Sequence, residues 1–283
     1  MNNRVLIIIL LGAVITFSAC INNTQEQPSG EEQLIVIVSI LPQADFVEQI
    51  GGNKTKAIVM IPPGASPTTY EPTANQLMEL SDAKIYAALG SGLPFEKVWL
   101  DKIRSVNKDM LIVNTSHGVD IIPKDPHIWL SPRSVKIQVE NIYQGLVQVD
   151  PGNKDLYFQN KEQFLEELTT LDMQINESLR GSNNRSFMVF HPSWEYFARD
   201  YNLTMIPVEI EGKEPSAGDM VNLIETAIQN NITVIFVQPQ FSTNSAQVIA
   251  DEIGASVVPI DPLGKDYITN MQIVTDAFTS TLL

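Results

Sequence analysis

The stretch that decides the fold is NKDLYFQNKEQFLEELTTLDMQINESLR, residues 153–180. Its apolar side chains recur at steps of three, four or seven residues, the spacing of one face of an α-helix. They are Tyr157, Phe164, Leu168, Leu171, Ile175 and Leu179. Pro151 precedes the run and Gly181 follows it, as proline and glycine often do at the two ends of a helix. Since no proline or glycine interrupts it, the stretch predicts one helix roughly 42 Å long.

Apolar runs that alternate with helical patterns lie on both sides of this helix. We expect strands at 34–39, 56–61, 84–89, 110–113, 186–190, 204–208, 233–237 and 256–260. We expect the other helices at 41–50, 73–80, 94–106, 132–149, 194–201, 216–230, 242–254 and 266–282. Such alternation favours mostly parallel sheets, whose loops at the strand ends usually carry ligands.

The predicted fold is therefore α/β, with two α/β lobes joined by one long linking helix and a cleft between the lobes. We place the N-terminal lobe at 34–151, the linking helix at 152–181 and the C-terminal lobe at 182–283. The alternative is a long surface helix of a single domain.

The start of the chain has the pattern of a secretory signal. Arg4 precedes thirteen residues, 5–17, that carry no charge, and Ser18-Ala19-Cys20 follow. This run is shorter than the roughly 20 residues of a transmembrane helix. Phe17-Ser18-Ala19-Cys20 resembles a lipobox, which implies removal of residues 1–19 and a lipid on Cys20. The polar segment 20–33 has almost nothing to bury and is expected to be a tether.

The charge composition of the chain limits the classes of molecule that it is expected to bind. The chain carries 18 basic and 33 acidic residues, and removal of residues 1–19 takes away one basic residue, Arg4, which leaves a net charge of −16. A nucleic acid is excluded as the expected partner because a phosphate backbone needs a basic face. Cys20 is the only cysteine, so no intramolecular disulfide can form.

Three polar residues stand at or near the ends of buried elements, where a cleft would lie. His127 precedes a predicted helix, whereas His191 and Asp261 each follow an apolar strand directly. Two imidazoles and a carboxylate suit Zn²⁺ or another first-row divalent ion. Taken singly, each residue is more simply a cap of a loop or helix. Their separations of 64 and 70 residues prove nothing alone.

Five short stretches, in their order along the chain, carry a resemblance. They are Tyr-Glu-Pro-Thr (70–73), Asp-Pro-His-Ile-Trp-Leu (125–130), His-Pro-Ser-Trp-Glu-Tyr-Phe-Ala (191–198), Glu-Pro-Ser-Ala (214–217) and Asp-Pro-Leu-Gly (261–264). Together the stretches resemble the zinc/manganese-type solute-binding lipoproteins of metal ABC transporters, over nearly the whole chain from residue 34. The resemblance implies two α/β lobes on a rigid helix, with a metal held between them.

The same resemblance implies the ligands. His127, His191 and Asp261 match three ligand positions of the family, and Thr68 stands where the family's first-loop histidine should be. Because a threonine hydroxyl is a poor zinc ligand, three outcomes stay open. Water completes a three-ligand site, Glu71 substitutes, or the metal site is lost and another solute occupies the cleft.

Other polar and aromatic residues are given structural roles. His117 matches no ligand position and is expected on the surface, and Gln238 is expected to support the site rather than bind metal. Tyr70, Trp129 and Trp194 are interpreted first as core and second as cleft wall.

The predicted function is capture of a divalent transition metal outside the cytoplasm and its delivery to an ABC permease. Zn²⁺ is the first choice, with Mn²⁺ or Fe²⁺ as alternatives. A monomer is expected, at the cell surface or in the periplasm, held to the membrane by the lipid on Cys20. The alternatives are a binding protein for another solute and an adhesin-like surface lipoprotein. A zinc hydrolase is less favoured, since neither HExxH nor Gly-x-Ser-x-Gly is present, and no enzyme is expected.

Overall fold

The structure is a computed structural model. It describes residues 33–182, 184–210 and 212–282. The predicted signal peptide, Cys20 and the tether up to residue 32 lie outside the described residues. Within them, no helix is both long and apolar enough to cross a membrane.

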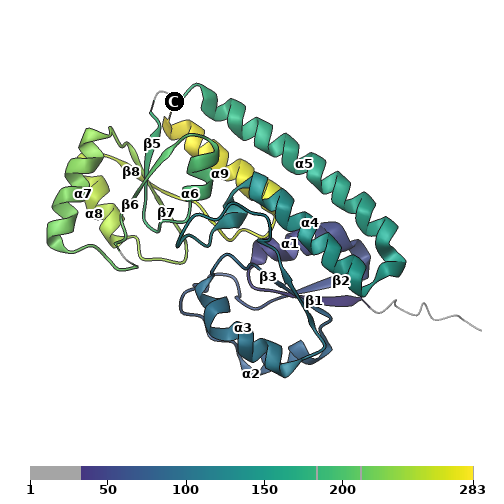
Figure 1. The fold of residues 1–283 in the computed structure, drawn as a ribbon. Coiled ribbons are helices and arrows are strands. Elements are labelled where there is room, and N and C mark those ends of the chain that lie inside the picture. Colours follow the sequence, from purple (N-terminus) through teal and green to yellow (C-terminus); the bar gives the residue numbers. More distant parts are fainter. Residues whose placement is uncertain (1–32, 183, 211, 283) are drawn as a thin grey trace, which may run out of the picture. The chain divides into compact units, whose positions relative to one another are not determined.

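The N-terminal lobe is built on a parallel four-stranded sheet with the order β2-β1-β3-β4 (Figure 1). Its strands are β1 (Leu34–Val38), β2 (Thr55–Val59), β3 (Ile85–Ala88) and β4 (Leu111–Asn114). Its helices are α1 (Leu41–Gly51), α2 (Ala74–Glu79), α3 (Pro94–Val106) and α4 (Pro132–Val149). Short 3₁₀ turns lie at Gly52–Lys54, Leu80–Asp82, Ile128–Leu130 and Pro151–Asn153. The predicted parallel sheet is confirmed, and the switch in strand order lies between β1 and β3.

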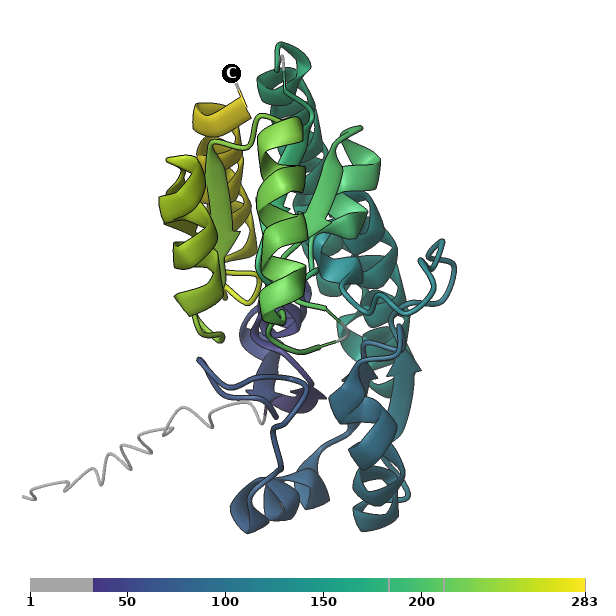
Figure 2. The ribbon, with the colours of Figure 1, turned by 90° about the vertical axis from the view of Figure 1, so that its left-hand side faces the viewer.

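The C-terminal lobe repeats this topology, because its parallel sheet has the order β6-β5-β7-β8. The strands are β5 (Ser186–Val189), β6 (Thr204–Pro207), β7 (Val234–Val237) and β8 (Ser256–Pro259). The helices are α6 (Glu195–Asp200), α7 (Ala217–Gln229), α8 (Asn244–Ile253) and α9 (Tyr267–Leu282). Figure 2 looks onto α7 and α8, with α9 and the linking helix behind the sheet.

The linking helix is α5 (Lys154–Arg180), and it follows the predicted stretch except for the first residue. All six residues of the predicted apolar face are buried. A seventh buried residue, Lys161, lies on the same helix and pairs with Glu140 and Glu162, each at 2.9 Å. Gly181 follows the last turn with a φ of −86°, so a left-handed glycine conformation is not what ends this helix.

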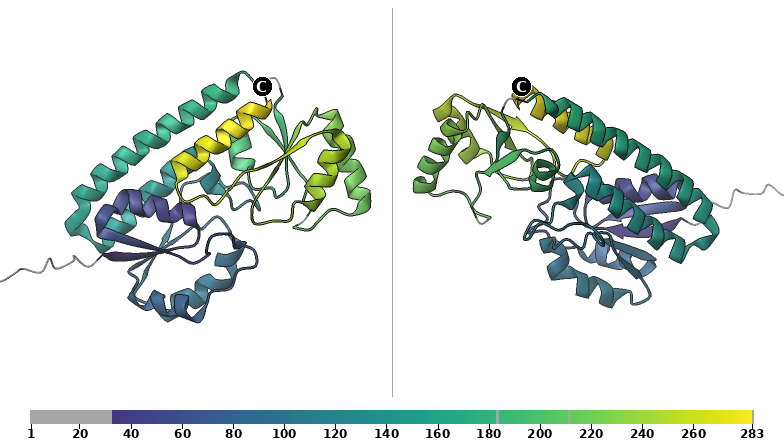
Figure 3. Two further views of the ribbon diagram at one scale, coloured as in Figure 1. Left: turned by 180° about the vertical axis from the view of Figure 1, so that it is seen from behind. Right: turned by 45° about the horizontal axis from the view of Figure 1, so that its top comes forward.

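The last helix of the chain returns along α5. α9 packs against α5, and the two run side by side in both views of Figure 3. Residues of α9 therefore contact both lobes: Phe278 packs on Phe187 of β5, while Tyr267 packs edge-on against Phe46 of α1 at 5.2 Å. The division of the chain at residues 151/152 and 181/182 remains a proposal, since one hydrophobic cluster runs across both boundaries.

Most element ends agree with the prediction to within one or two residues, and the deviations have local causes. Most strands are shorter than predicted by one or two residues, whereas β4 keeps the predicted length and is shifted by one residue. Gly51 belongs to α1, and Gly52, with a φ of 54°, is the residue that ends it. Thr73 and Ser216 cap α2 and α7 through reciprocal hydrogen bonds with Gln76 and Asp219.

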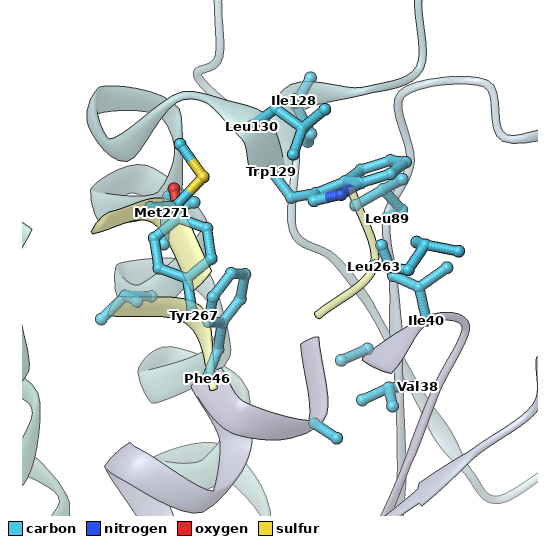
Figure 4. Packing of buried hydrophobic residues seen from close by; sticks show 14 of the residues in the cluster. Val38, Ile40, Phe46, Leu89, Ile128, Trp129, Leu130, Leu263, Tyr267 and Met271 are labelled. Carbon is cyan, nitrogen blue, oxygen red and sulfur yellow. The ribbon is translucent and has the colours of Figure 1, made fainter. Parts of the chain in front are cut away.

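The two lobes meet around a buried tryptophan (Figure 4). The Trp129 side chain is 1% exposed, lies near Leu89 and Leu263, and donates its Nε1–H to the Pro262 carbonyl at 2.7 Å. Asp45 of α1 accepts the Tyr267 N–H at 3.0 Å, which fixes the start of α9 on the N-terminal lobe. The loop between β8 and α9 is thereby tied to the N-terminal lobe at two points.

Candidate metal centre

A cavity of about 200 Å³ lies where the loops of the two lobes meet. Every lining residue follows the carboxyl end of a strand, namely β2, β3, β4, β5, β7 or β8, which is where ligands bind in open α/β sheets. The lining residues are Pro67, Thr68, Leu93, Pro94, Lys124, Pro126, His127, Trp129, His191, Pro192, Ser193, Gln240, Phe241, Pro262 and Leu263. Both lobes thus supply the walls, as the alternating pattern of the sequence predicts.

His127 is held from the N-terminal lobe by the residue two places before it. The Asp125 Oδ1 atom lies 2.6 Å from His127 Nδ1 and accepts the His127 backbone N–H at 2.9 Å. The imidazole side chain is only 12% exposed, and burial lowers its pKa from the ordinary value of 6.5 although Asp125 acts in the opposite direction. A neutral ring that donates Nδ1–H to Asp125 keeps Nε2 as its free lone pair.

His191 is held from the C-terminal lobe by residues of two other strand ends. Its Nδ1 lies 2.5 Å from Oε2 of Glu209, a buried carboxylate that follows β6. Gln238 accepts the His191 N–H at 3.2 Å and donates to the His191 carbonyl at 2.8 Å. The Phe241 ring stacks on the imidazole with a centroid separation of 4.5 Å. Position, tautomer and ring plane of His191 are therefore all fixed.

The two imidazoles lie against one another across the cavity. Their ring centroids are 5.3 Å apart and their planes are nearly perpendicular, at 80°. Because a carboxylate engages Nδ1 of each ring, Nε2 of each is left for an external partner. A carboxylate behind each ligating histidine is the usual support of histidine–metal bonds, since it fixes the tautomer and raises the basicity of the ligand.

Thr68 lines the same cavity but is exposed. Its Oγ1 atom lies 2.6 Å from the Ser66 hydroxyl, so this oxygen already has a partner. Glu71, the substitute considered above, is exposed and is not among the lining residues.

Asp261 does not line the cavity, but it contacts Gln240, which does. Its Oδ1 atom accepts the Gln240 side-chain amide at 3.0 Å and the Leu263 N–H at 2.9 Å. Asn270 donates to the Asp261 carbonyl at 2.8 Å. In the described ranges, no three His, Cys, Asp or Glu side chains come close enough to hold one metal ion. The structure therefore brings His127, His191 and Thr68 to one cavity, and connects Asp261 to it through Gln240.

Four of the residues given structural roles lie as expected, whereas Tyr70 is only partly buried. His117 is exposed and lies outside this cavity, and Gln238 is buried, with its amide bonded to His191 and Ser193. Trp129 and Trp194 are fully buried, and Trp129 also forms part of the cavity wall.

Sequence reasoning missed four residues of this site: Glu209, Phe241, Gln240 and Lys124. A signal existed for Glu209, because it follows β6 as His191 follows β5, and neighbouring parallel strands end at the same edge. Phe241 and Gln240 follow β7 in the same way. Lys124 lies in a loop where the sequence gives no orientation, so only the structure could place it.

Two α/β lobes, one long connecting helix and a cavity built from the strand ends of both lobes define a two-lobed solute-binding protein. More narrowly, the chain belongs to the family described as zinc-uptake complex component A, periplasmic, whose model matches residues 36–281.

Named relatives extend over most of the chain. The high-affinity zinc uptake system protein ZnuA of Bacillus subtilis is 26% identical, over 97% of this chain and 96% of its own. The manganese-binding lipoprotein MntA of Halalkalibacterium halodurans is 25% identical, over 97% of each chain. A crystal structure of ZnuA matches with a TM-score of 0.87 and 42% identity, over 89% of this chain and 100% of that one.

Proposed function

We infer that this chain is the extracytoplasmic solute-binding component of an ABC importer for a divalent transition metal, with Zn²⁺ as the first choice and Mn²⁺ or Fe²⁺ as alternatives. The observation that carries the proposal is the pair of facing imidazoles, one from each lobe, each with Nδ1 bound to a carboxylate. The family and the names of the zinc- and manganese-binding relatives support it.

The geometry supports capture by His127 and His191 through their two Nε2 atoms. Imidazole suits zinc, whereas manganese prefers more oxygen ligands, so this pair favours Zn²⁺ over Mn²⁺. The Asp261 carboxylate would join as a third ligand after exchanging its hydrogen bond from Gln240 for the metal. Thr68 has the weakest claim as a ligand, because its hydroxyl is neutral and bonded to Ser66.

Release to a permease needs a relative movement of two lobes that share α5. Since the buried face of α5 is unbroken, we expect this movement to be small compared with that of hinged binding proteins. Small-angle scattering that shows a large compaction on addition of zinc would contradict this expectation.

Calorimetric titration of the metal-free protein with Zn²⁺ tests the metal site. His127→Ala and His191→Ala should each nearly abolish binding, because each removes a ligand, and loss of an outer-shell partner alone costs about 10–100-fold. His117→Ala is the matched control, since this exposed histidine lies outside the cavity, and it should bind like the wild type. Equal binding by all four proteins would overturn the assignment of the site.

The location is part of the proposal. We propose that the mature chain starts at Cys20 and is held to the membrane by a lipid on this residue, as the resemblance of residues 17–20 to a lipobox implies. Cys20→Ser should then move the protein from the membrane fraction to the soluble fraction of its own cell. Recovery of unlipidated wild-type protein from the soluble fraction would contradict the anchor.

A further inference from the structure

His127 ends a segment of the N-terminal lobe that has no regular structure to hold it. Residues 115–127 connect β4 to the 3₁₀ turn at Ile128–Leu130 and contain no helix or strand. Within this segment the Asp125 N–H bonds to the Ile122 carbonyl at 3.1 Å, which closes a β-turn over residues 122–125. A ligand that follows a turn on such a loop depends on contacts from other elements for its position.

The C-terminal lobe provides such a contact through the hydroxyl of Tyr196. This tyrosine lies in α6, is fully buried and accepts the Ile122 N–H at 2.8 Å. Its own O–H donates to the Asp125 carbonyl at 3.3 Å. One hydroxyl therefore bonds to both ends of the turn, once as acceptor and once as donor. Arg199 of the same helix donates to the Asp120 carbonyl at 3.2 Å, so α6 contacts this loop at a further position.

The position of the turn reaches His127 through the Asp125 side chain. Asp125 Oδ1 accepts the His127 backbone N–H and lies 2.6 Å from His127 Nδ1. Its Oδ2 is buried and has no hydrogen-bond partner among the residues that the structure describes. Because no other hydrogen bond fixes this carboxylate, its direction depends on the backbone position of residue 125, which the bonds to Tyr196 help to set.

One short segment of the C-terminal lobe therefore contacts both halves of the site. The segment 191–196 carries His191 at its start and Tyr196 at its end. Because the Tyr196 hydroxyl reaches the turn from the opposite lobe, its support of His127 depends on the relative position of the two lobes. A movement that separates the lobes would break these bonds and loosen His127.

We propose that Tyr196 is a positioning residue for metal capture: from the opposite lobe, its hydroxyl holds the turn that places Asp125, and through Asp125 it orients His127 for the metal. This inference rests on the proposed function, because it assigns a further residue to the same site.

The first test is Tyr196→Phe, which removes one hydroxyl and keeps the buried ring, so the fold should be kept. By calorimetry of the metal-free protein, the affinity for Zn²⁺ should fall roughly tenfold, at the lower end of the about 10–100-fold cost of losing an outer-shell partner. Tyr157→Phe is the matched control. It removes the hydroxyl of another buried tyrosine, bonded to Asp150 at 2.6 Å, which does not line the cavity. The control should lose stability to a similar degree and keep the zinc affinity of the wild type, which separates positioning from general stabilisation.

A double-mutant cycle tests the route through Asp125. Asp125→Ala removes the carboxylate, so its loss of zinc affinity should already include the contribution of Tyr196. Adding Tyr196→Phe to Asp125→Ala should then change the affinity by less than about twofold, the limit within which independent effects are resolved. A second tenfold loss in this background would show that Tyr196 acts by another route, and would overturn the proposal.

Amide hydrogen exchange of the metal-free protein tests the contact itself. The Ile122 N–H should be protected in the wild type and in Tyr157→Phe, and it should exchange faster in Tyr196→Phe. An Ile122 amide that exchanges in the wild type as fast as in an unfolded chain would overturn the proposal. So would a Tyr196→Phe protein that binds zinc like the wild type, and either result leaves the proposed function intact. No zinc binding by the wild type would overturn both.

Discussion

The two lobes have the same strand order but different packing. In the N-terminal sheet, neighbouring residues of β1 such as Val36 and Ile37 belong to one continuous hydrophobic cluster, although they point to opposite faces. In the C-terminal sheet the faces are separate: Phe187 and Val189 of β5 join the main cluster, whereas Met188 belongs to a second cluster under α7 and α8.

This difference teaches that topology alone does not set how a lobe is stabilised. α9 packs on the inner face of the C-terminal sheet, where Phe278 contacts Phe187 and Phe236, and it connects this sheet to α5 and the rest of the molecule. The outer face depends on α7 and α8, and Ala227 is the single residue of α7 that is buried. We expect the outer layer to open locally while the rest stays folded, since few buried apolar contacts mean low local stability.

The largest effect is expected for Leu171→Pro, in the middle of the helix that both lobes share. Proline removes a helix hydrogen bond at a cost of about 3 kcal/mol or more, and loss of this buried side chain adds about 2–5 kcal/mol. Urea denaturation followed by circular dichroism should show both lobes unfolded or severely destabilised. Met173→Ala, at a site 60% exposed on the same helix, should change stability by less than about 0.5 kcal/mol. A variant whose C-terminal lobe keeps its stability would show that this lobe does not depend on α5.

The next effect is expected for Phe278→Ala in α9. The ring lies 4.5 Å from Phe236 and 4.7 Å from Phe187, between centroids, so its loss opens a cavity on the inner face of the sheet. The free energy of unfolding should therefore fall by about 3–5 kcal/mol. The midpoint of global unfolding should shift without a separate transition, and a purely local loss of amide protection would speak against a continuous main cluster.

A smaller effect is expected for Ile249→Ala in α8, which belongs to the second cluster. The free energy of unfolding should fall by about 2 kcal/mol. Amide hydrogen exchange should accelerate in α7 and α8, while the amides of α1 and α4 stay protected. Val248→Ala is the control, because this neighbouring side chain is 56% exposed. Equal acceleration in the N-terminal lobe would remove the distinction between the two packings.

The smallest effect concerns pH and the histidine of the N-terminal lobe. Since burial lowers the pKa of His127, the unfolded chain takes up its proton at a higher pH than the folded one. The contribution of this residue to the stability of the metal-free protein should be complete above about pH 6.5 and should fall as the pH drops toward the lowered pKa. Urea titrations of wild type and His127→Gln at about pH 7 and about pH 5 measure it. An identical pH dependence of the two proteins would contradict the prediction.

Much of the fold could be predicted because its elements carry local patterns. The apolar face of α5, the caps Thr73 and Ser216 and the alternation of strands with helices are all visible in the sequence, and the two-lobed α/β fold is confirmed. Strand order and the return of α9 along α5 could not be predicted, since they depend on contacts between distant residues such as Phe278 and Phe187.

The candidate site could be predicted in its residue types but not in its detailed contacts. His127 and His191 meet in one cavity because both follow strands that end at facing edges. Asp261 also follows a strand, yet its carboxylate bonds to Gln240 and Leu263, and no pattern in the sequence reveals such a choice of rotamer. The support of His191 by Glu209 depends on the pairing of β5 with β6, which is again a matter of tertiary structure.

The hydrogen bond from the Tyr267 N–H to Asp45 joins residues 222 positions apart in the chain. Synthesis proceeds from the N-terminus at about 5–20 residues per second, so more than ten seconds separate the appearance of the two partners. During this interval the apolar edge of α1, with Phe46, lacks the aromatic ring that covers it in the finished protein. The nascent N-terminal half therefore exposes apolar surface that is prone to aggregation until the last helix is synthesised. A chaperone that shields α1 would have its greatest effect at this stage.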